Sequence, residues 1–169
     1  MKALIKFVFL ITAGILISCG GKEEKKTKKF EYNQQPATEK TVEQPAAASE
    51  LPASKRASLD NKGVGKVKHV ELNPTIDEAM AARGAELFKT NCTACHKPNK
   101  RFIGPSPAGI LELRTPEWVM NMILDPKLMT EQDPIAKALL VEFNGAAMAN
   151  QNLTEAQARD ILEYFRTLK

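Results

Sequence analysis

Apolar residues near the C-terminus follow the spacing of one face of a helix, and a polar cap stands in front of them. Thr154-x-x-Gln157 is a capping box, in which the first and fourth residues satisfy each other's backbone N–H groups. The apolar residues after it recur three or four positions apart: Ala158, Ile161, Leu162, Phe165 and Leu168. This pattern predicts an amphipathic helix at the end of the chain, with one face in a core.

A second helix is predicted over residues 76–90, with Thr75 as its cap. Asp77 and Glu78 fall in its first turn, where carboxylates favour the positive end of the helix dipole. Gly84 lies in the middle, where a glycine costs roughly 1 kcal/mol relative to alanine. We therefore expect Gly84 to allow another helix to approach closely.

Two more helices begin at a capping residue followed by proline, which suits the first helical position. Thr115-Pro116 predicts a helix over residues 116–124 that Asp125-Pro126 ends. Asp133-Pro134 predicts another helix, to about Phe143. No convincing strand accompanies them, so the predicted fold class is all-α.

Residues 1–18 have the pattern of a secretory signal peptide. Two lysines precede the apolar stretch 7–17, which is shorter than the about 20 residues that a helix needs to cross a bilayer. The stretch ends in Leu16-Ile-Ser-Cys19-Gly, which resembles the lipobox of bacterial lipoproteins. That resemblance implies that Cys19 is acylated and becomes the N-terminus. We then expect a lipid anchor in the bacterial cell membrane or outer membrane, with the domain facing the periplasm.

Residues 19–69 have a composition that is poor in large apolar side chains. Such a segment cannot offset the entropy of ordering its backbone, so we expect a flexible tether that carries the lipidated cysteine. The folded domain is expected over residues 70–169. It has 11 basic and 13 acidic residues, a net charge of −2, although the whole chain of 169 residues has +4. This balance gives no indication of nucleic-acid binding.

Cys92-Thr-Ala-Cys95-His96 is the attachment signature of c-type haem. Two thiols at this spacing add to the porphyrin vinyl groups, and the adjacent imidazole ligates the iron. A thioredoxin-like redox pair would need a βαβ setting, and a zinc site would need a fourth ligand, for which the only other histidine is His69. A disulfide between the two cysteines would leave His96 without a role. The motif therefore predicts one covalent haem c, and the three cysteines divide into one for lipid and two for haem.

From residue 76 to residue 169 the chain resembles class I cytochrome c. The run from Gly84 to His96 is similar to the first helix and haem site of that family, and Gly104-Pro105 is similar to the loop that follows. The resemblance implies helices packed around one haem, with Gly84 and Phe88 crossing the last helix near Ile161. It also implies that the Pro105 carbonyl accepts a hydrogen bond from His96 Nδ1, which would fix the tautomer of the ligand.

The sixth iron ligand must come from later in the chain. By the resemblance, Met148, which lies just before the last helix, matches the axial-methionine loop of the family, with Ala149 where the family often has proline. Met129 is the second choice, because it follows the break at Asp125-Pro126. Met120 and Met122 lie two apart on a helix and are expected to pack around the haem. Bis-histidine ligation through His69 is the alternative to exclude.

With histidine and methionine ligands, the iron would have no open position, and the chain lacks the motifs of common catalytic sites. We therefore expect an electron carrier rather than an enzyme. We expect it to be a monomer that exchanges single electrons with respiratory redox proteins. A fixed subunit of a larger respiratory complex is the alternative, as is a haem peroxidase or gas sensor if the sixth position is open.

Residues 101–105 and 114–124 resemble lipoprotein cytochromes associated with nitrous oxide reductase systems. This narrower resemblance implies a copper reductase as the electron acceptor. Trp118, within the second segment, could donate a hydrogen bond to a haem propionate, or it could pack in the helix core.

Overall fold

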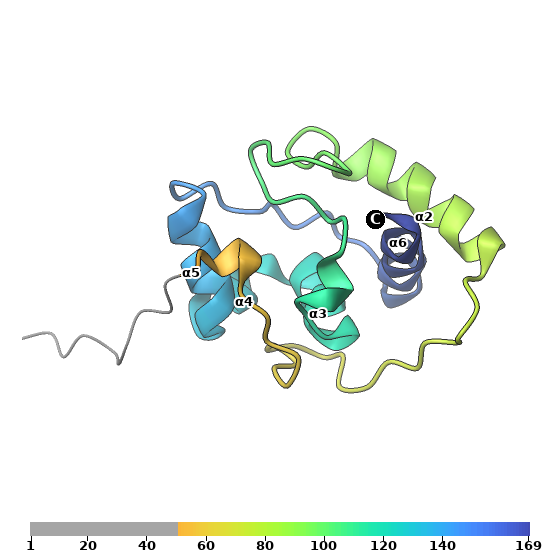
Figure 1. Ribbon diagram of the computed structural model, residues 1–169, viewed down its shortest axis with the longest axis horizontal. Helices are drawn as coiled ribbons and strands as arrows, with labels where there is room; N and C mark the ends of the chain where they lie inside the picture. Colours follow the sequence, from red (N-terminus) through yellow and green to blue (C-terminus); the bar gives the residue numbers. More distant parts are fainter. Residues whose placement is uncertain (1–50) are drawn as a thin grey trace, which may run out of the picture. The chain divides into compact units, whose positions relative to one another are not determined.

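The computed structural model describes residues 51–169, which form helices and connecting loops (Figure 1). The signal peptide, the lipobox cysteine Cys19 and the tether as far as residue 50 lie outside the described residues. No strand occurs between residues 51 and 169, where the only β-type pairings are two isolated bridges. The predicted all-α fold is confirmed. The helices in chain order are η1 (Ala53–Lys55), α2 (Glu78–Asn91), η2 (Ile110–Glu112), α3 (Pro116–Leu124), α4 (Pro126–Gln132), α5 (Pro134–Glu142) and α6 (Glu155–Thr167).

Helices α3, α5 and α6 begin where the sequence predicts. Thr115 Oγ1 accepts a hydrogen bond from the N–H of Trp118 at 3.1 Å, and Asp133 Oδ1 accepts one from Ala136 at 2.8 Å. Thr154 and Gln157 form both bonds of the capping box that opens α6. These side chains satisfy N–H groups that the first helical turn leaves without a partner. None of the helices in residues 51–169 is long and apolar enough to cross a membrane.

Helix α2 begins two residues later than the sequence predicts. Its cap is Asp77, whose Oδ1 accepts from the N–H of Met80 at 2.9 Å, and not Thr75. The N–H of Asp77 in turn donates to Glu163 of α6 at 2.9 Å. An aspartate is as good a cap as a threonine, and here the contact with α6 decides between the two.

The sequence pattern does not predict α4. It assigns Asp125-Pro126 to the end of α3, but the same pair also caps the next helix, with Asp125 Oδ1 accepting from the N–H of Leu128 at 3.0 Å. Met129 therefore lies on a helix and not in a loop. Its side chain is fully buried, and its Sδ is 3.1 Å from the backbone nitrogen of Val64.

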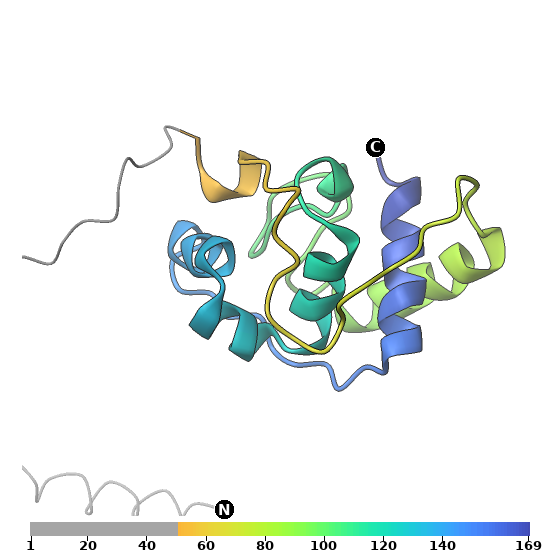
Figure 2. The same cartoon turned by 90° about the horizontal axis from the view of Figure 1, so that it is seen from below.

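Helices α2 and α6 cross at Gly84, as the sequence predicts (Figures 1 and 2). A Cβ on Gly84 would stand 2.5 Å from the carbonyl carbon of Asp160, so only glycine allows this approach. Beside the crossing, the ring centroid of Phe88 lies 5.5 Å from that of Tyr164 and 5.6 Å from that of Phe165. The aromatic contacts and the glycine together fix α2 against α6.

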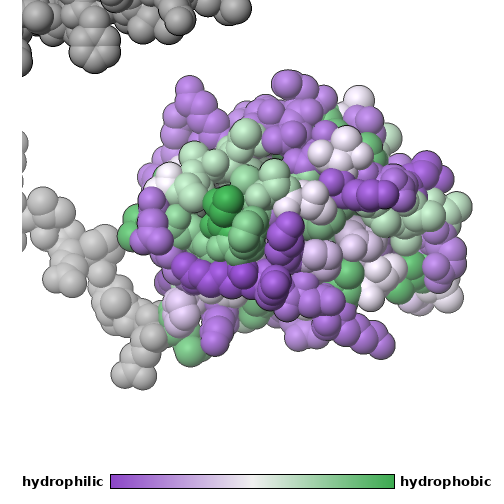
Figure 3. Space-filling view, turned by 90° about the horizontal axis from the view of Figure 1, so that it is seen from above, coloured by the Kyte–Doolittle hydropathy of each residue, from purple (hydrophilic) through white to green (hydrophobic). Residues whose placement is uncertain are grey.

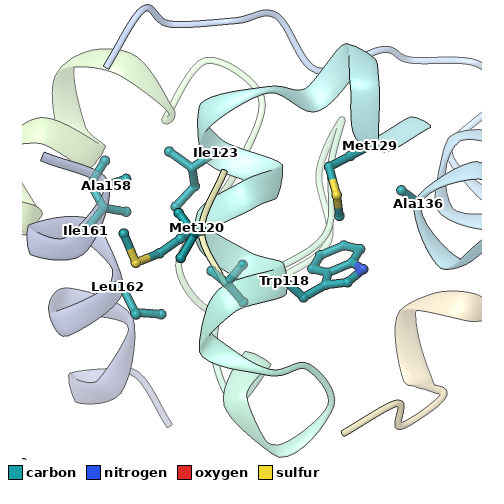
Figure 4. Close-up of a cluster of buried hydrophobic side chains, with 10 residues drawn as sticks. Trp118, Met120, Ile123, Met129, Ala136, Ala158, Ile161 and Leu162 are labelled. Atoms are coloured by element: carbon teal, nitrogen blue, oxygen red, sulfur yellow. The ribbon is translucent and has the colours of Figure 1, made fainter. Parts of the chain in front are cut away.

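The core lies on both sides of α3 (Figure 4). On one side, Met120 and Ile123 face Ile161 and Leu162 of α6, and on the other side the ring of Trp118 faces Met129. All of these side chains are less than 9% exposed. Helix α3 is thus the central element, which explains why its sequence is apolar almost all round.

Residues 53–70 form a strap that runs across α3 (Figure 2). The sequence assigns residues 51–69 to the flexible tether, whereas in the structure Ala53 and Val67 of the strap are each only 3% exposed. The strap is held largely through its backbone carbonyls. Those of Ala53, Asn61 and Val67 accept hydrogen bonds from side chains of residues 114–121. Because side-chain donors of the domain satisfy the strap's backbone, the strap can be ordered without a long apolar run of its own.

Candidate functional site

The Cys92–His96 motif forms a turn directly after α2. Cys92 is the C-cap of that helix, and its carbonyl accepts from the N–H groups of Cys95 at 3.0 Å and His96 at 2.8 Å. Cys92 is half-buried, Cys95 is exposed, and both thiols are free. Burial, assisted by Cys95, raises the pKa of the Cys92 thiol to about 11. A redox cysteine of the thioredoxin type needs a lowered pKa, so this environment does not favour that alternative.

The imidazole of His96 is fixed by the loop that follows the motif. His96 Nδ1 lies 2.8 Å from the carbonyl oxygen of Pro105, which matches the contact that the family resemblance implies. A carbonyl only accepts, so Nδ1 carries the proton and Nε2 keeps its lone pair for a metal. Gly104 packs flat on the ring, since a Cβ there would stand 2.5 Å from His96 Cε1.

Both cysteines and His96 line a cavity of about 370 Å³. Its walls come from the loop after the motif, from η2, from α3 and α5, and from the segment between α5 and α6. Apolar side chains dominate its lining, and Ile103 in the wall is 48% exposed. The face seen in Figure 3 carries an apolar patch that hydrophilic residues border. A cavity of this size and character suits a large planar apolar ligand.

The structure separates the methionine candidates. Met148 lines the cavity together with His96, and so does Met122 of α3. Met129 is not part of the cavity wall, because α4 turns it into the core against Trp118 and the strap. Met120 is 2% exposed and packs toward α6. The arrangement of the described residues therefore favours Met148 over Met129, as the sequence does.

His69 does not approach this site. Its side chain is 71% exposed, and its Nε2 lies 3.5 Å from Glu71 Oε1. Within residues 51–169, no three side chains of the His, Cys, Asp or Glu type are grouped so that they could hold a metal ion by themselves. The described residues therefore offer His69 neither to a haem as a second histidine nor to a zinc ion as a fourth ligand.

Of the two roles that the sequence left open for Trp118, the structure favours core packing over a contact with a haem propionate. Trp118 Nε1 donates to Asp133 Oδ1 at 3.1 Å, and the whole residue is 3% exposed. An indole has a single N–H donor, so none remains for a propionate. The ring still lines the cavity, which makes Trp118 a packing residue of the site.

The sequence does not indicate most of the cavity wall, and three of the wall residues come from unexpected parts of the chain. Ser54 and Lys55 come from the strap, and Arg114 comes from the residue just before the cap of α3. The composition of residues 51–69 predicts a tether, so it gives no indication that the strap lines a site. Arg114 precedes the cap of an apolar helix, and nothing in the local sequence distinguishes it from an exposed charged residue.

An all-α domain with a C-x-x-C-H turn and a carbonyl-anchored histidine at the mouth of an apolar cavity defines a c-type cytochrome. The family model for cytochrome c matches residues 81–169, and the chain belongs to this family. It accordingly binds haem c covalently, with its iron. The apolar cavity, the two thiols at its rim and the available His96 Nε2 all fit that group.

Solved structures of cytochrome c from Rhodothermus marinus are similar to this chain. One is 40% identical, with a TM-score of 0.59, and the match covers 69% of this chain and 92% of that chain. An engineered form of the same cytochrome, bound to a carbene intermediate, is also 40% identical, with a TM-score of 0.57 and coverage of 69% and 93%. No curated protein matches in sequence.

Proposed function

We propose that this cytochrome is a monohaem electron carrier, anchored by lipid and facing the periplasm. Electron transfer is the general role of the family. The observation that carries the proposal is that His96, anchored through Nδ1, and Met148 line one apolar cavity. Two such side chains would ligate an iron that exchanges electrons, and they would leave it no position open for a substrate.

Each residue of the site has a distinct part in this proposal. Cys92 and Cys95 would hold the porphyrin by thioether bonds, and His96 and Met148 would ligate its iron. Bound haem supplies a one-electron couple between ferric and ferrous iron. Pro105 fixes the orientation of His96 and increases its basicity, as groups that accept a hydrogen bond from a metal-ligating histidine do. The apolar walls exclude water and so favour the ferrous state, because it carries less charge.

The near-infrared absorption band of methionine-ligated ferric haem tests the ligand assignment. We expect this band in the wild-type protein and in Met129→Ala, and we expect Met148→Ala to lose it. Met122→Ala is the matched control inside the cavity, and it should keep the band. Loss of the band in Met122→Ala or Met129→Ala alone would reassign the ligand. Its absence from the wild type would favour an open sixth position, and with it a peroxidase or a gas sensor.

The lipid anchor is proposed from Leu16-Ile-Ser-Cys19-Gly. Metabolic labelling with a radioactive fatty acid should mark the wild-type chain, and Cys19→Ser should abolish both the label and membrane retention. Retention of Cys19→Ser in the membrane fraction would contradict this anchor. Fractionation of inner and outer membranes then locates the labelled protein.

The electron acceptor is proposed to be a nitrous oxide reductase, from the resemblance of residues 101–105 and 114–124. Stopped-flow mixing of the ferrous protein with that reductase should show reoxidation that depends on nitrous oxide. Absence of reoxidation, while another carrier supports turnover of the same reductase, would exclude this partner. Sedimentation of detergent-extracted protein separates a free monomeric carrier, which we expect, from a fixed subunit of a larger complex.

A further inference from the structure

The segment that carries Met148 has few hydrogen bonds of its own. In the described part of the chain, no backbone–backbone hydrogen bond involves residues 147–153. A bond of 3.3 Å from Asn150 Nδ2 to the carbonyl of Leu124 anchors the side toward α6. Met148 is half-buried, but the residues on either side of it are exposed. A segment with so few contacts takes its position from the elements at its ends, so the place of Met148 depends on where α5 ends.

The end of α5 is fixed through Glu142, its last residue. Glu142 Oε2 accepts from the N–H of Ser54 at 2.8 Å, and Oε1 accepts from the hydroxyl of the same serine. Oε1 also accepts from Arg101 Nη1 at 3.0 Å, and Arg101 Nη2 donates to the Glu142 carbonyl at 2.9 Å. The Arg101 guanidinium further lies over the ring of Phe143, 3.9 Å from its centroid. Hydrogen bonds to a carboxylate and a cation–π contact therefore meet at one helix end.

These contacts join three segments that are far apart in the sequence. Ser54 belongs to η1 of the strap, which lies beside α5 (Figures 1 and 2). Arg101 belongs to the loop that fixes the imidazole of His96, and Glu142 stands where the chain leaves α5 toward Met148. The segments of both proposed iron ligands thus meet the strap at a single carboxylate.

Glu142 is ionised at neutral pH although its side chain is only 15% exposed. Burial by itself would raise the pKa of this carboxylate, but the hydrogen bonds from Ser54 and Arg101 outweigh burial and hold the pKa below the ordinary 4.5. An ionised carboxylate offers two acceptor oxygens and can bind all of these donors at once, whereas an amide has a single acceptor oxygen. Hydrogen bonds to an ionised group are also roughly twice as strong as those between neutral groups.

We propose that Glu142 is a positioning residue for the sixth iron ligand. It binds the strap and the loop after the haem motif to the end of α5, and so fixes the point from which the chain runs to Met148. This inference rests on the proposed ligation by Met148. Glu142 is not part of the cavity wall, so it acts through the segment that follows it and not by contact with the haem. Ser54 precedes the family match at residues 81–169, so the strap supports the ligand from outside the family domain.

Displacement of the methionine by added imidazole tests this role in the full-length ferric protein. Imidazole competes with the methionine sulfur for the iron, and loss of the near-infrared band reports the exchange. Glu142→Gln keeps the size of the side chain but replaces one acceptor oxygen by a donor. We expect the imidazole concentration at half-loss of the band to fall about tenfold or more, which is the factor that a hydrogen bond to a charged group contributes to an equilibrium. Ser54→Ala and Arg101→Gln remove donors to the same carboxylate and should lower this concentration by a smaller factor.

Glu163→Gln is the matched control. Glu163 is also a buried carboxylate that accepts from arginines and from a backbone N–H, but it lies on α6 and binds α2. Its variant should lower the free energy of unfolding and leave the imidazole concentration at half-loss as in the wild type. An unchanged concentration in Glu142→Gln, or an equal fall in Glu163→Gln, would overturn the role of Glu142. Ser54→Ala removes only a hydroxyl, so it decides the question by the same criterion if Glu142→Gln fails to retain haem.

The ligand assignment and the role of Glu142 fail in distinguishable ways. If Met148→Ala loses the band while Glu142→Gln responds to imidazole as the wild type does, the ligand stands and Glu142 has no part in positioning it. A wild-type protein without the band, or a band that Met148→Ala retains, would overturn both proposals.

Discussion

Asn121 of α3 binds both backbone groups of Val67 in the strap. Its Oδ1 accepts from the Val67 N–H at 3.0 Å, and its Nδ2 donates to the Val67 carbonyl at 2.9 Å. The same Nδ2 lies 3.1 Å from the carbonyl of Lys62. The amide side chain of Asn121, which is 1% exposed, therefore forms the pair of backbone hydrogen bonds that a neighbouring strand would form.

Asn121→Ala should release the middle of the strap. The substitution leaves buried backbone groups of the strap without partners, at a cost of about 1–3 kcal/mol for each unsatisfied group. We expect a lower urea midpoint of unfolding and faster proteolytic cleavage between residues 60 and 70. Asn73→Ala, at an exposed position, should change the free energy of unfolding by less than about 0.5 kcal/mol. Equal stability of the two variants would show that the amide does not hold the strap.

Gly84→Ala should separate α2 from α6. The added methyl group meets the backbone of Asp160 and Ile161, which no rotamer change can move aside. Overpacking of this kind costs about 1–3 kcal/mol, measured as the free energy of unfolding of the ferric protein. Ala82→Ser, exposed on the same helix, serves as the control and should be close to neutral. A neutral Gly84→Ala would mean that the two helices can shift apart freely.

Trp118→Phe distinguishes packing from propionate binding. The variant removes the donor to Asp133 but keeps an aromatic ring in the cavity wall, so we expect a loss of about 1 kcal/mol in stability. The propionate infrared band and the pH profile of the potential should stay as in the wild type. A shift of that band in Trp118→Phe would instead support a contact between Trp118 and a propionate.

Glu163 makes the stability of the domain depend on pH. Burial opposes ionisation of its carboxylate, but hydrogen bonds from Asp77 N and from Arg159 and Arg166 outweigh burial and lower its pKa below the ordinary 4.5. A lowered folded-state pKa adds stability that is complete above 4.5 and is lost as the pH falls through the folded value.

Glu163→Gln should therefore be less stable than the wild type near neutral pH, and its stability should fall less between neutral pH and acid. Thermal unfolding recorded as a function of pH measures both differences. Glu86→Gln, at a side chain that is 75% exposed, serves as the control. Its unfolding temperature should fall as steeply toward acid pH as that of the wild type. If the unfolding temperature of Glu163→Gln falls just as steeply toward acid pH, the loss of stability in acid belongs to other carboxylates.

The helices that the sequence predicts are those whose signals are local. Caps at Thr115, Asp133 and Thr154 need only the residues beside them, and all three form as expected. The start of α2 depends on a distant partner, because Glu163 accepts from the N–H of Asp77 and so favours that residue as the cap. Asp125-Pro126 has the same form as the other helix starts, but it directly follows a predicted helix, where the same pair also indicates a stop.

Sequence analysis located most of the candidate site for a related reason. Cys92, Cys95 and His96 form one contiguous motif, and Pro105 follows within ten residues. Arg114 and the strap meet only through tertiary structure, more than 50 residues apart, and the contacts use backbone oxygens. No periodicity or composition could indicate such a pairing.

Contacts through backbone oxygens leave the exposed side chains of the strap, such as those of Ala57, Asp60 and Lys66, free to vary. Arg114, Thr115 and Asn121 donate to backbone carbonyls of the strap, and every residue type provides such a carbonyl. The accepting residues are Ala53, Arg56, Asn61 and Val67. Mutations at these exposed positions can thus accumulate over evolutionary time with little effect on the fold, provided that the path of the main chain is kept. Relatives that share the strap should be recognised by an arginine and a threonine directly before α3 and an asparagine within it, and not by the exposed residues of the strap.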